Sequence, residues 1–248
     1  MSHRLRSERQ TPVSMLRSAV AQPAEGKIMN NVAPLESDSL ARYLAEREPL
    51  YRVRSPDYPI RMIEQLASLW RGEHKRVLDV GGGTGLVAQC VADHFPVDHV
   101  HTVDVVNRFR SDLTIGHSVF DGVNLVFDDS SFDCAMMFNV LHHVAITERV
   151  PLLREIRRVA GRGPIYIKDH LALDQGDRVR LAILDVLGNV PFSGMIRASY
   201  LSEAEWSDLA AASGYRIAGR VSGNYRSGYM KAIFPNRLEI SMRLEPLS

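Results

Sequence analysis

Hydrophobic positions along the chain follow two alternating spacings. Residues 36–48 and 59–71 carry apolar side chains at helical intervals, which predicts two amphipathic helices. The short apolar run at 76–80 ends at a cluster of glycines, which is typical of a buried parallel strand. The same criteria predict further helices at 85–95, 147–160 and 176–188, and further strands at 100–106, 131–140, 164–170, 215–221 and 237–244.

This alternation of strands and helices predicts an α/β fold built on a doubly wound, mostly parallel sheet. Ser202 and Glu205 have the spacing of a capping box, so another helix is predicted to begin there. Residues 1–34 show no sustained period and contain scattered proline and glycine, and we expect a flexible N-terminal extension. Residues 35–248 are expected to form one domain, with the two N-terminal helices as a cap.

Composition narrows the possible partners. The 248 residues have a formal net charge of +1, so the chain lacks the basic field that supplies most non-specific affinity for nucleic acid.

Cys90 and Cys134 fall within a predicted helix and a predicted strand and are expected to be reduced core residues. No apolar run approaches the roughly 18 residues needed to cross a bilayer, and no signal-peptide core is visible, which favours a cytoplasmic protein.

The glycine cluster at 77–85, VLDVGGGTG, is the most informative stretch. Glycines directly after a buried strand let the backbone approach a ligand, while the next helix directs free N–H groups toward it. We therefore expect a nucleotide-like ligand. The dinucleotide fingerprint needs a glycine at the sixth position counted from Gly81, but Leu86 stands there, so the stretch does not match an NAD-binding site. It does not match a phosphate-binding loop either, because no GK[ST] tripeptide occurs nearby.

Asp79, Gly81, Gly83 and Gly85 resemble the D/ExGxGxG signature of class I S-adenosylmethionine-dependent methyltransferases. The resemblance runs from about residue 60 to residue 170 and is closest to the small-molecule branch that includes the ubiquinone-type enzymes. It implies a Rossmann-like fold with a seven-stranded sheet and S-adenosylmethionine as cofactor. It also implies that Asp79 and the backbone of Gly81 and Gly83 hold the methionyl end.

The resemblance assigns further roles at the strand ends. Asp104 would accept hydrogen bonds from the ribose hydroxyls, since a carboxylate is a good acceptor for a vicinal diol. Asp121, followed by Gly122, would receive the adenine amino group, although an Asp-Gly pair is also a common turn former. Asn139, at the end of the predicted fourth strand, would lie near the sulfonium.

Three histidines are candidates for the chemistry. A hydroxyl or ring-nitrogen acceptor often loses a proton on methylation, and a histidine suits that role. His142 is the first candidate for a general base and His143 its rival, although a histidine here can simply cap the next helix. His170 ends the fifth strand beside Asp169, which could orient an imidazole, but a surface-turn role fits as well. No metal is expected, because the sequence specifies neither ligand count nor geometry.

The region near 174–201 is expected to form a lid insertion. Its apolar residues, with tyrosines from the N-terminal helices, would cover an apolar acceptor or simply pack on the sheet. These residues are Phe192, Met195, Tyr200, Tyr43, Tyr51 and Tyr58.

The expected function is methyl transfer to an oxygen or nitrogen of a small biosynthetic or secondary metabolite, and that acceptor is the expected partner. A quinone-type C-methyltransferase and a cofactor-binding scaffold without catalysis are the alternatives. The [DN]PP[YF] signature of nucleobase amino methylation is absent where Asn139-Val140-Leu141-His142 stands, so we expect no nucleic-acid substrate. The oligomeric state is left open.

Overall fold

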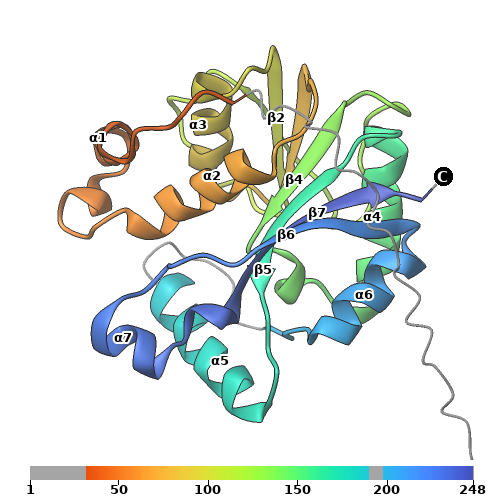
Figure 1. Ribbon diagram of the computed structural model, residues 1–248. Helices are drawn as coiled ribbons and strands as arrows, with labels where there is room; N and C mark the ends of the chain where they lie inside the picture. The colour runs from red at the N-terminus through yellow and green to blue at the C-terminus, as the bar shows by residue number, and fades with distance from the viewer. Residues whose placement is uncertain (1–31, 190–197, 248) are drawn as a thin grey trace, which may run out of the picture.

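A computed structural model describes residues 32–189 and 198–247. Seven strands form one sheet in the order β3-β2-β1-β4-β5-β7-β6 (Figure 1). The strands are β1 (Arg76–Val80), β2 (His99–Asp104), β3 (Gly116–Val119), β4 (Cys134–Phe138), β5 (Ile165–His170), β6 (Tyr215–Val221) and β7 (Glu239–Pro246). The predicted doubly wound, Rossmann-like, seven-stranded sheet is confirmed.

Strands β1 to β5 run parallel. β1 lies between β2 and β4, with Val77 opposite both Val100 and Cys134. Successive strands β1, β2 and β3 step to one side, and the chain then returns to the other side of β1 to form β4 and β5. Doubly wound sheets bind ligands at the carboxyl ends of the strands beside such a reversal. β7 lies antiparallel between β5 and β6, and β6 forms the other edge of the sheet.

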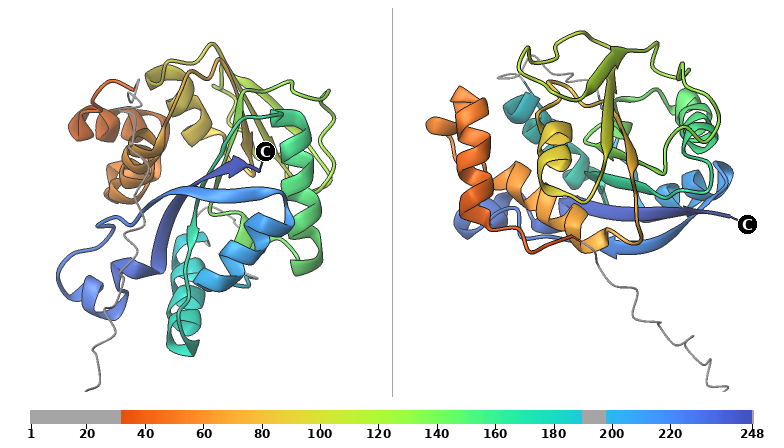
Figure 2. Two further views of the ribbon diagram at one scale, coloured as in Figure 1. Left: turned by 45° about the vertical axis from the view of Figure 1, so that its right-hand side comes forward. Right: turned by 90° about the horizontal axis from the view of Figure 1, so that it is seen from above.

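Helices cover both faces of the sheet (Figure 2). The α-helices are α1 (Ser37–Arg47), α2 (Asp57–Leu69), α3 (Leu86–His94), α4 (Ile146–Ala160), α5 (Gln175–Asn189), α6 (Glu203–Ala212) and α7 (Gly228–Ile233). Short 3-10 turns are η1 (Pro49–Arg52), η2 (Leu141–His143) and η4 (Asn236–Leu238). In Figure 1, α5 and α7 lie beyond the carboxyl end of β5.

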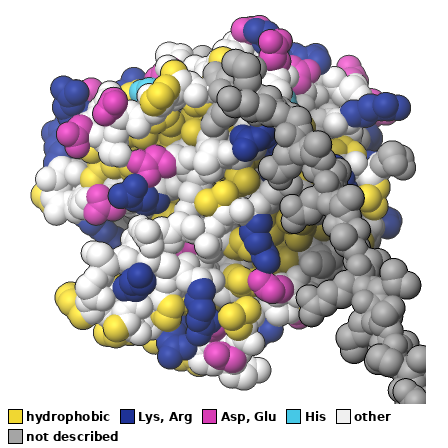
Figure 3. Space-filling view, in the orientation of Figure 1, with side chains coloured by type: hydrophobic (Ala, Val, Ile, Leu, Met, Phe, Trp, Pro, Cys, Tyr) yellow, Lys and Arg dark blue, Asp and Glu magenta, His cyan; other side chains and the backbone are white. Residues whose placement is uncertain are grey.

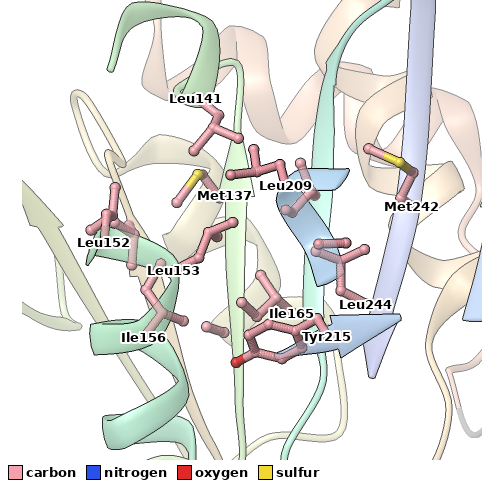
Figure 4. Close-up of a cluster of buried hydrophobic side chains, with 14 of the residues drawn as sticks. Met137, Leu141, Leu152, Leu153, Ile156, Ile165, Leu209, Tyr215, Met242 and Leu244 are labelled. Carbon is pink, nitrogen blue, oxygen red and sulfur yellow. The ribbon is translucent and has the colours of Figure 1, made fainter. Parts of the chain in front are cut away.

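Alternate strand residues contribute to two separate cores. Leu78 and Val80 of β1 belong to the cluster that includes buried residues of α4 and α6. Val77, between them, belongs to the cluster formed with α1, α2 and α3. Figure 4 shows part of the first cluster, where side chains of α4, α6 and the central strands point toward one another. All six residues of β5 are buried, as expected for a parallel strand covered on both faces.

The hydrophobic pattern predicted most elements to within a few residues. The capping box of α6 is present, since Ser202 and Glu205 exchange hydrogen bonds between side chain and backbone. Cys90 and Cys134 are buried and free, as predicted. β3 was not predicted, because its residues, GHSV, are mostly exposed and form no apolar run. Most of the predicted extension 1–34 lies outside the described residues.

Among the described helices, none is long and apolar enough to cross a membrane. On the face shown in Figure 3, basic and acidic side chains are interspersed and do not gather into one basic patch. This distribution agrees with the near-zero net charge of the chain.

Candidate active site

A cavity of about 660 Å³ opens along the carboxyl ends of the strands. Its size falls in the range of small-molecule sites, about 300–1,000 Å³. Five of the residues predicted to hold the cofactor line it, namely Gly81, Asp104, Asp121, Gly122 and Asn139. Two of the three candidate catalytic histidines, His142 and His143, line the same cavity.

The glycine turn after β1 approaches the end of β2 closely. The Gly81 N–H donates to the carbonyl oxygen of Val103 at 2.7 Å. Gly81, Gly83 and Gly85 all have positive φ, which glycine adopts without strain. Gly85 also begins α3 as its N-cap residue. The turn therefore leaves backbone, rather than side chains, facing the cavity at Gly81.

Asp79 lies beneath this turn and is not among the residues that line the cavity. Its side chain is 2% exposed and accepts a 2.8 Å hydrogen bond from the Thr102 hydroxyl. Burial raises the pKa of Asp79 to about 7, and the Thr102 hydrogen bond offsets only part of this effect. A Cβ at Gly82 would collide with both side chains, so glycine is required there for packing.

Asp104 ends β2 and points its carboxylate at the turn. Its Oδ2 accepts a hydrogen bond from the Gly83 N–H at 2.7 Å, and its Oδ1 accepts one from the Val106 N–H at 3.0 Å. The guanidinium of Arg108 lies 3.5 Å from Oδ2. These contacts fix the carboxylate at the cavity wall.

Asp121 and Gly122 follow β3 and form a turn that lines the cavity. Asp121 Oδ1 accepts hydrogen bonds from the backbone N–H groups of Val123 and Asn124, at 2.8 and 2.6 Å. The side-chain hydrogen bond from Asn124 also lowers the pKa of Asp121. Gly122 has φ +99°, a conformation that favours glycine. The Asp-Gly pair is thus a turn that also borders the cavity.

Asn139 follows β4 with φ +56°, which few residues other than glycine adopt. Its side-chain oxygen accepts hydrogen bonds from the Lys168 ammonium at 2.6 Å and the Tyr58 hydroxyl at 3.2 Å. Lys168 is almost fully buried and pairs with Glu239 of β7 at 2.6 Å. Although burial acts against it, the charge of Lys168 holds the pKa of Glu239 well below its usual value. A buried ion pair therefore supports the end of β4.

His142 is enclosed between two carboxylates. Its Nδ1 lies 2.6 Å from Asp169 Oδ1, and its Nε2 lies 3.5 Å from Asp185 Oδ2. The side chain is 1% exposed. Burial alone would lower the pKa of His142, but Asp169 and Asp185 together raise it to about 9. Each ring nitrogen of His142 therefore faces a buried carboxylate.

The rings of His143 and His170 both lie close to the ring of His142. The ring of His143 is 4.0 Å from that of His142, and its side chain is partly exposed at the cavity. His170 is buried, and its ring is 4.7 Å from that of His142. His170 Nδ1 lies 3.0 Å from Glu239, and its Nε2 lies 3.4 Å from Asp185. His170 does not line the cavity.

Asp185 of α5 joins these histidines from beyond the end of the sheet. Its carboxylate accepts a 2.6 Å hydrogen bond from the Tyr200 hydroxyl. Burial opposes ionisation, but the nearby rings of His142 and His170 hold the pKa of Asp185 below its usual value. Tyr200, predicted as part of a lid, thus packs in this cluster, whereas Phe192 and Met195 lie outside the described residues.

The comparisons with known proteins agree with this geometry. A family model described as a methyltransferase domain matches residues 51–218, which is more than half of the chain. The chain belongs to the methyltransferase domain family. The methyltransferase resembles Phosphoethanolamine N-methyltransferase 2 of Caenorhabditis elegans, with 28% identity over 104 residues. That match covers 38% of this chain and spans only 23% of the relative's length.

Solved structures share the fold. One is a complex between the Haloferax volcanii Trm112 methyltransferase activator and a methyltransferase, with a TM-score of 0.61 and 16% identity, over 87% of this chain and 100% of that chain. Another is the mitomycin 7-O-methyltransferase MmcR, with a TM-score of 0.57 and 18% identity, over 83% of this chain and 60% of that chain. At these identities the likeness shows the fold alone.

S-adenosylmethionine is the cofactor of this methyltransferase, as the family implies, and the cavity fits it. The turn at Gly81 presents backbone to the cavity, and a Cβ there would collide with Val140. The carboxylate of Asp104 stands at the next strand's end, held by Gly83. A cavity bordered by a glycine turn and a fixed carboxylate suits a nucleoside with a sugar diol.

The sequence predicted one carboxylate partner of the histidines, Asp169, but not the other two, Asp185 and Glu239. Asp169 was predicted as a possible partner for an imidazole, and the structure pairs it with His142. Asp185 and Glu239 were not predicted, because they lie on α5 and β7 and reach the histidines only through the fold. No short-range motif marks either residue.

Proposed function

We propose that this methyltransferase transfers a methyl group from S-adenosylmethionine to an oxygen or nitrogen of a small-molecule acceptor. The observation that carries the proposal is a single cavity lined both by Gly81 and Asp104 and by the His142–His143 pair. When bound, the cofactor supplies a methyl group that is already activated by its sulfonium. The protein's main task is then to hold the acceptor in line with that group.

At the cofactor end, we assign the ribose hydroxyls to Asp104. Each of its carboxylate oxygens accepts one backbone N–H, and a carboxylate oxygen can accept more than one donor. We assign the methionyl end to the backbone of Gly81 and Gly83, with Asp79 supporting the turn from beneath. Asn139 fixes the neighbouring edge of the cavity through its bonds to Lys168 and Tyr58.

The adenine end is assigned to Asp121 and Gly122. Asp121 Oδ1 already accepts two backbone N–H groups, whereas Oδ2 accepts one hydrogen bond from the described residues, donated by the Asn124 side-chain amide. Oδ2 is therefore the oxygen that we expect to receive the adenine amino group. Phe120 lines the same part of the cavity and offers an apolar surface to the base.

At the acceptor end, the wall is formed by His142 and His143. Asp169 fixes the ring of His142, which makes Asp169 a positioning residue. His170 supports this wall through Asp185 and does not contact the cavity. An acceptor hydroxyl or amine held against this wall meets groups that can bind it and take part in removing its proton.

The relatives support a small acceptor. The names of Phosphoethanolamine N-methyltransferase 2 and of mitomycin 7-O-methyltransferase specify methylation of a nitrogen and an oxygen, respectively, on small molecules. The cavity volume and the small net charge of +1 favour an acceptor of that size over a nucleic acid.

An acceptor screen tests this proposal. S-adenosylhomocysteine release is measured with panels of small alcohols, phenols and amines, and with RNA and protein mixtures as comparison. We expect turnover with a small hydroxyl or amine compound, slowed about a hundredfold by His142→Ala. The matched control is His99→Ala, on an exposed histidine at the opposite end of β2, which should retain the wild-type rate. Turnover confined to RNA or protein would contradict the proposal.

A further inference from the structure

The cluster around His142 has an unusual arrangement of ring nitrogens. The Nδ1 of His142 is bonded to the buried Asp169 at 2.6 Å, which leaves Nε2 as the other ligand atom. Nε2 is fully buried and has no hydrogen-bond partner among the described residues. Its nearest carboxylate oxygen, on Asp185, lies 3.5 Å away, beyond the usual hydrogen-bond range of about 2.7–3.2 Å. A buried, unpartnered ring nitrogen needs an explanation.

Three side chains of this cluster bring possible metal-ligand atoms close together. His142, His143 and Asp185 each offer a ligand atom, and the three atoms lie within 4.8 Å of one another. Zinc-type ions bind nitrogen and oxygen ligands at about 2.0–2.2 Å, so the ligands of a tetrahedral ion lie about 3.3–3.5 Å apart. The 3.5 Å separation between His142 Nε2 and Asp185 Oδ2 matches that value.

The surrounding residues hold the ligands in place. Metal-binding histidines commonly donate their second ring N–H to a carboxylate, which fixes the ring and its tautomer. Asp169 does this for His142. Tyr200 donates a 2.6 Å hydrogen bond to the carboxylate of Asp185. Both carboxylates are buried, so a cation between them would be stabilised by two negative charges.

We propose that His142, His143 and Asp185 bind one divalent transition-metal ion of the zinc type in the wall of the cavity. Two imidazoles and one carboxylate favour zinc, iron or cobalt over magnesium or calcium, which prefer oxygen ligands. Three protein ligands leave a position open for water or for an acceptor atom. This proposal differs from the sequence expectation of no metal, because Asp185 joins the histidines only in the folded chain.

The proposal that an ion binds here depends only on the positions of its ligands. The proposal that the ion takes part in catalysis rests on the proposed methyl transfer. Because His142 and His143 line the cavity, an ion bound there would lie beside the acceptor. A coordinated hydroxyl group is more easily deprotonated than a free one. We therefore expect acceptors with a hydroxyl group to benefit most.

Zinc titration of the chelator-treated full chain tests the site directly. Isothermal calorimetry should show one zinc ion per chain, and cobalt should give a visible absorption band when added in its place. Asp185→Asn and His142→Ala should each weaken zinc binding at least about tenfold, and Asp169→Asn by about 10–100-fold. His99→Ala, on an exposed histidine away from the cluster, should bind zinc like the wild type.

S-adenosylhomocysteine binding by the same samples separates this proposal from the proposed function. Retained S-adenosylhomocysteine binding by Asp185→Asn shows that this variant is folded. If His142→Ala fails to fold, the zinc affinity of the near-isosteric Asp185→Asn variant tests the ion site by itself. A wild-type chain that binds the nucleoside but no zinc, or variants that bind zinc as tightly as the wild type, would overturn the ion site alone. Zinc binding without nucleoside binding would overturn the methyl-transfer proposal instead.

Discussion

At the residue scale, the turn after β1 contains glycines for two different reasons. Gly81, Gly83 and Gly85 have positive φ, which is the backbone requirement behind the recognised motif. Gly82 has no positive φ, but its Cα packs against the side chains of Thr102 and Asp79. The spacing of the motif predicts the first group, whereas the crowding at Gly82 is visible only in the folded structure.

Gly82→Ala should therefore lower the free energy of unfolding. The added methyl group must displace Thr102 or Asp79, and overpacking of this kind costs about 1–3 kcal/mol. The matched control is Gly188→Ala in α5, where a Cβ meets nothing within 4 Å. That change should be neutral or stabilising by up to about 1 kcal/mol, since alanine favours helix. Urea denaturation compares the two, and equal stabilities would contradict the packing argument.

Asp79 should make stability depend on pH. Burial raises its pKa from 3.8 to about 7 in the folded protein. The folded state therefore holds this proton more tightly than the unfolded chain does. The resulting stabilisation is full below about pH 4 and is lost as the pH rises through 7. A shift of this size corresponds to about 4 kcal/mol.

The Asp79→Asn variant tests this linkage. Asparagine keeps an oxygen that accepts the Thr102 hydrogen bond, but it cannot ionise. The free energy of unfolding of the variant should fall less than that of the wild type between pH 4 and pH 7. Urea denaturation at several pH values measures the difference, and parallel curves for the two proteins would exclude Asp79 as the source.

At the scale of elements, the local hydrophobic pattern was sufficient to predict a strand or helix that has its own apolar run or amphipathic period. The buried run at 76–80 and the amphipathic pattern at 147–160 correspond to β1 and α4. β3 has no such signal, because its ladder with β2, rather than an apolar run, makes Gly116–Val119 a strand. The short helix α7 likewise has no buried residue and was not predicted.

The capping box of α6 gives a prediction at this scale. Ser202→Ala removes the side-chain oxygen that accepts the Glu205 N–H and should cost about 1 kcal/mol of stability. Ser207→Ala is the control, because Ser207 lies exposed in the middle of the same helix, where alanine is favoured. Thermal unfolding of both variants measures the effect. A Ser202 variant as stable as the Ser207 variant would show that the box contributes nothing.

At the scale of the whole molecule, the site is assembled from segments far apart in sequence. Asp104 and Asn139 could be predicted because parallel strands bring their carboxyl ends to one edge. The partners of Asn139 and His142 could not, since Tyr58, Glu239 and Asp185 arrive from α2, β7 and α5. Such contacts depend on how the helices dock, which local periodicity does not specify.

The buried pair of Lys168 and Glu239 ties several of these segments together. Lys168→Met leaves the Glu239 carboxylate buried without its ammonium partner, although Arg226 still contacts it. We expect a loss of about 3–5 kcal/mol. Adding Glu239→Gln should recover part of this loss, because the charge that was left unpaired is removed. Denaturation of the single and double variants measures the coupling, and additive losses would contradict it.

Calorimetric titration with S-adenosylhomocysteine tests the central claim, that the cavity beside the glycine turn binds the cofactor. The wild type should bind one equivalent. Asp104→Ala should weaken binding at least about tenfold, as expected for loss of hydrogen bonds to a carboxylate, while Asp98→Ala, an exposed residue at the other end of the sheet, should leave it unchanged. No binding by the wild type, or equal binding by Asp104→Ala, would contradict the account.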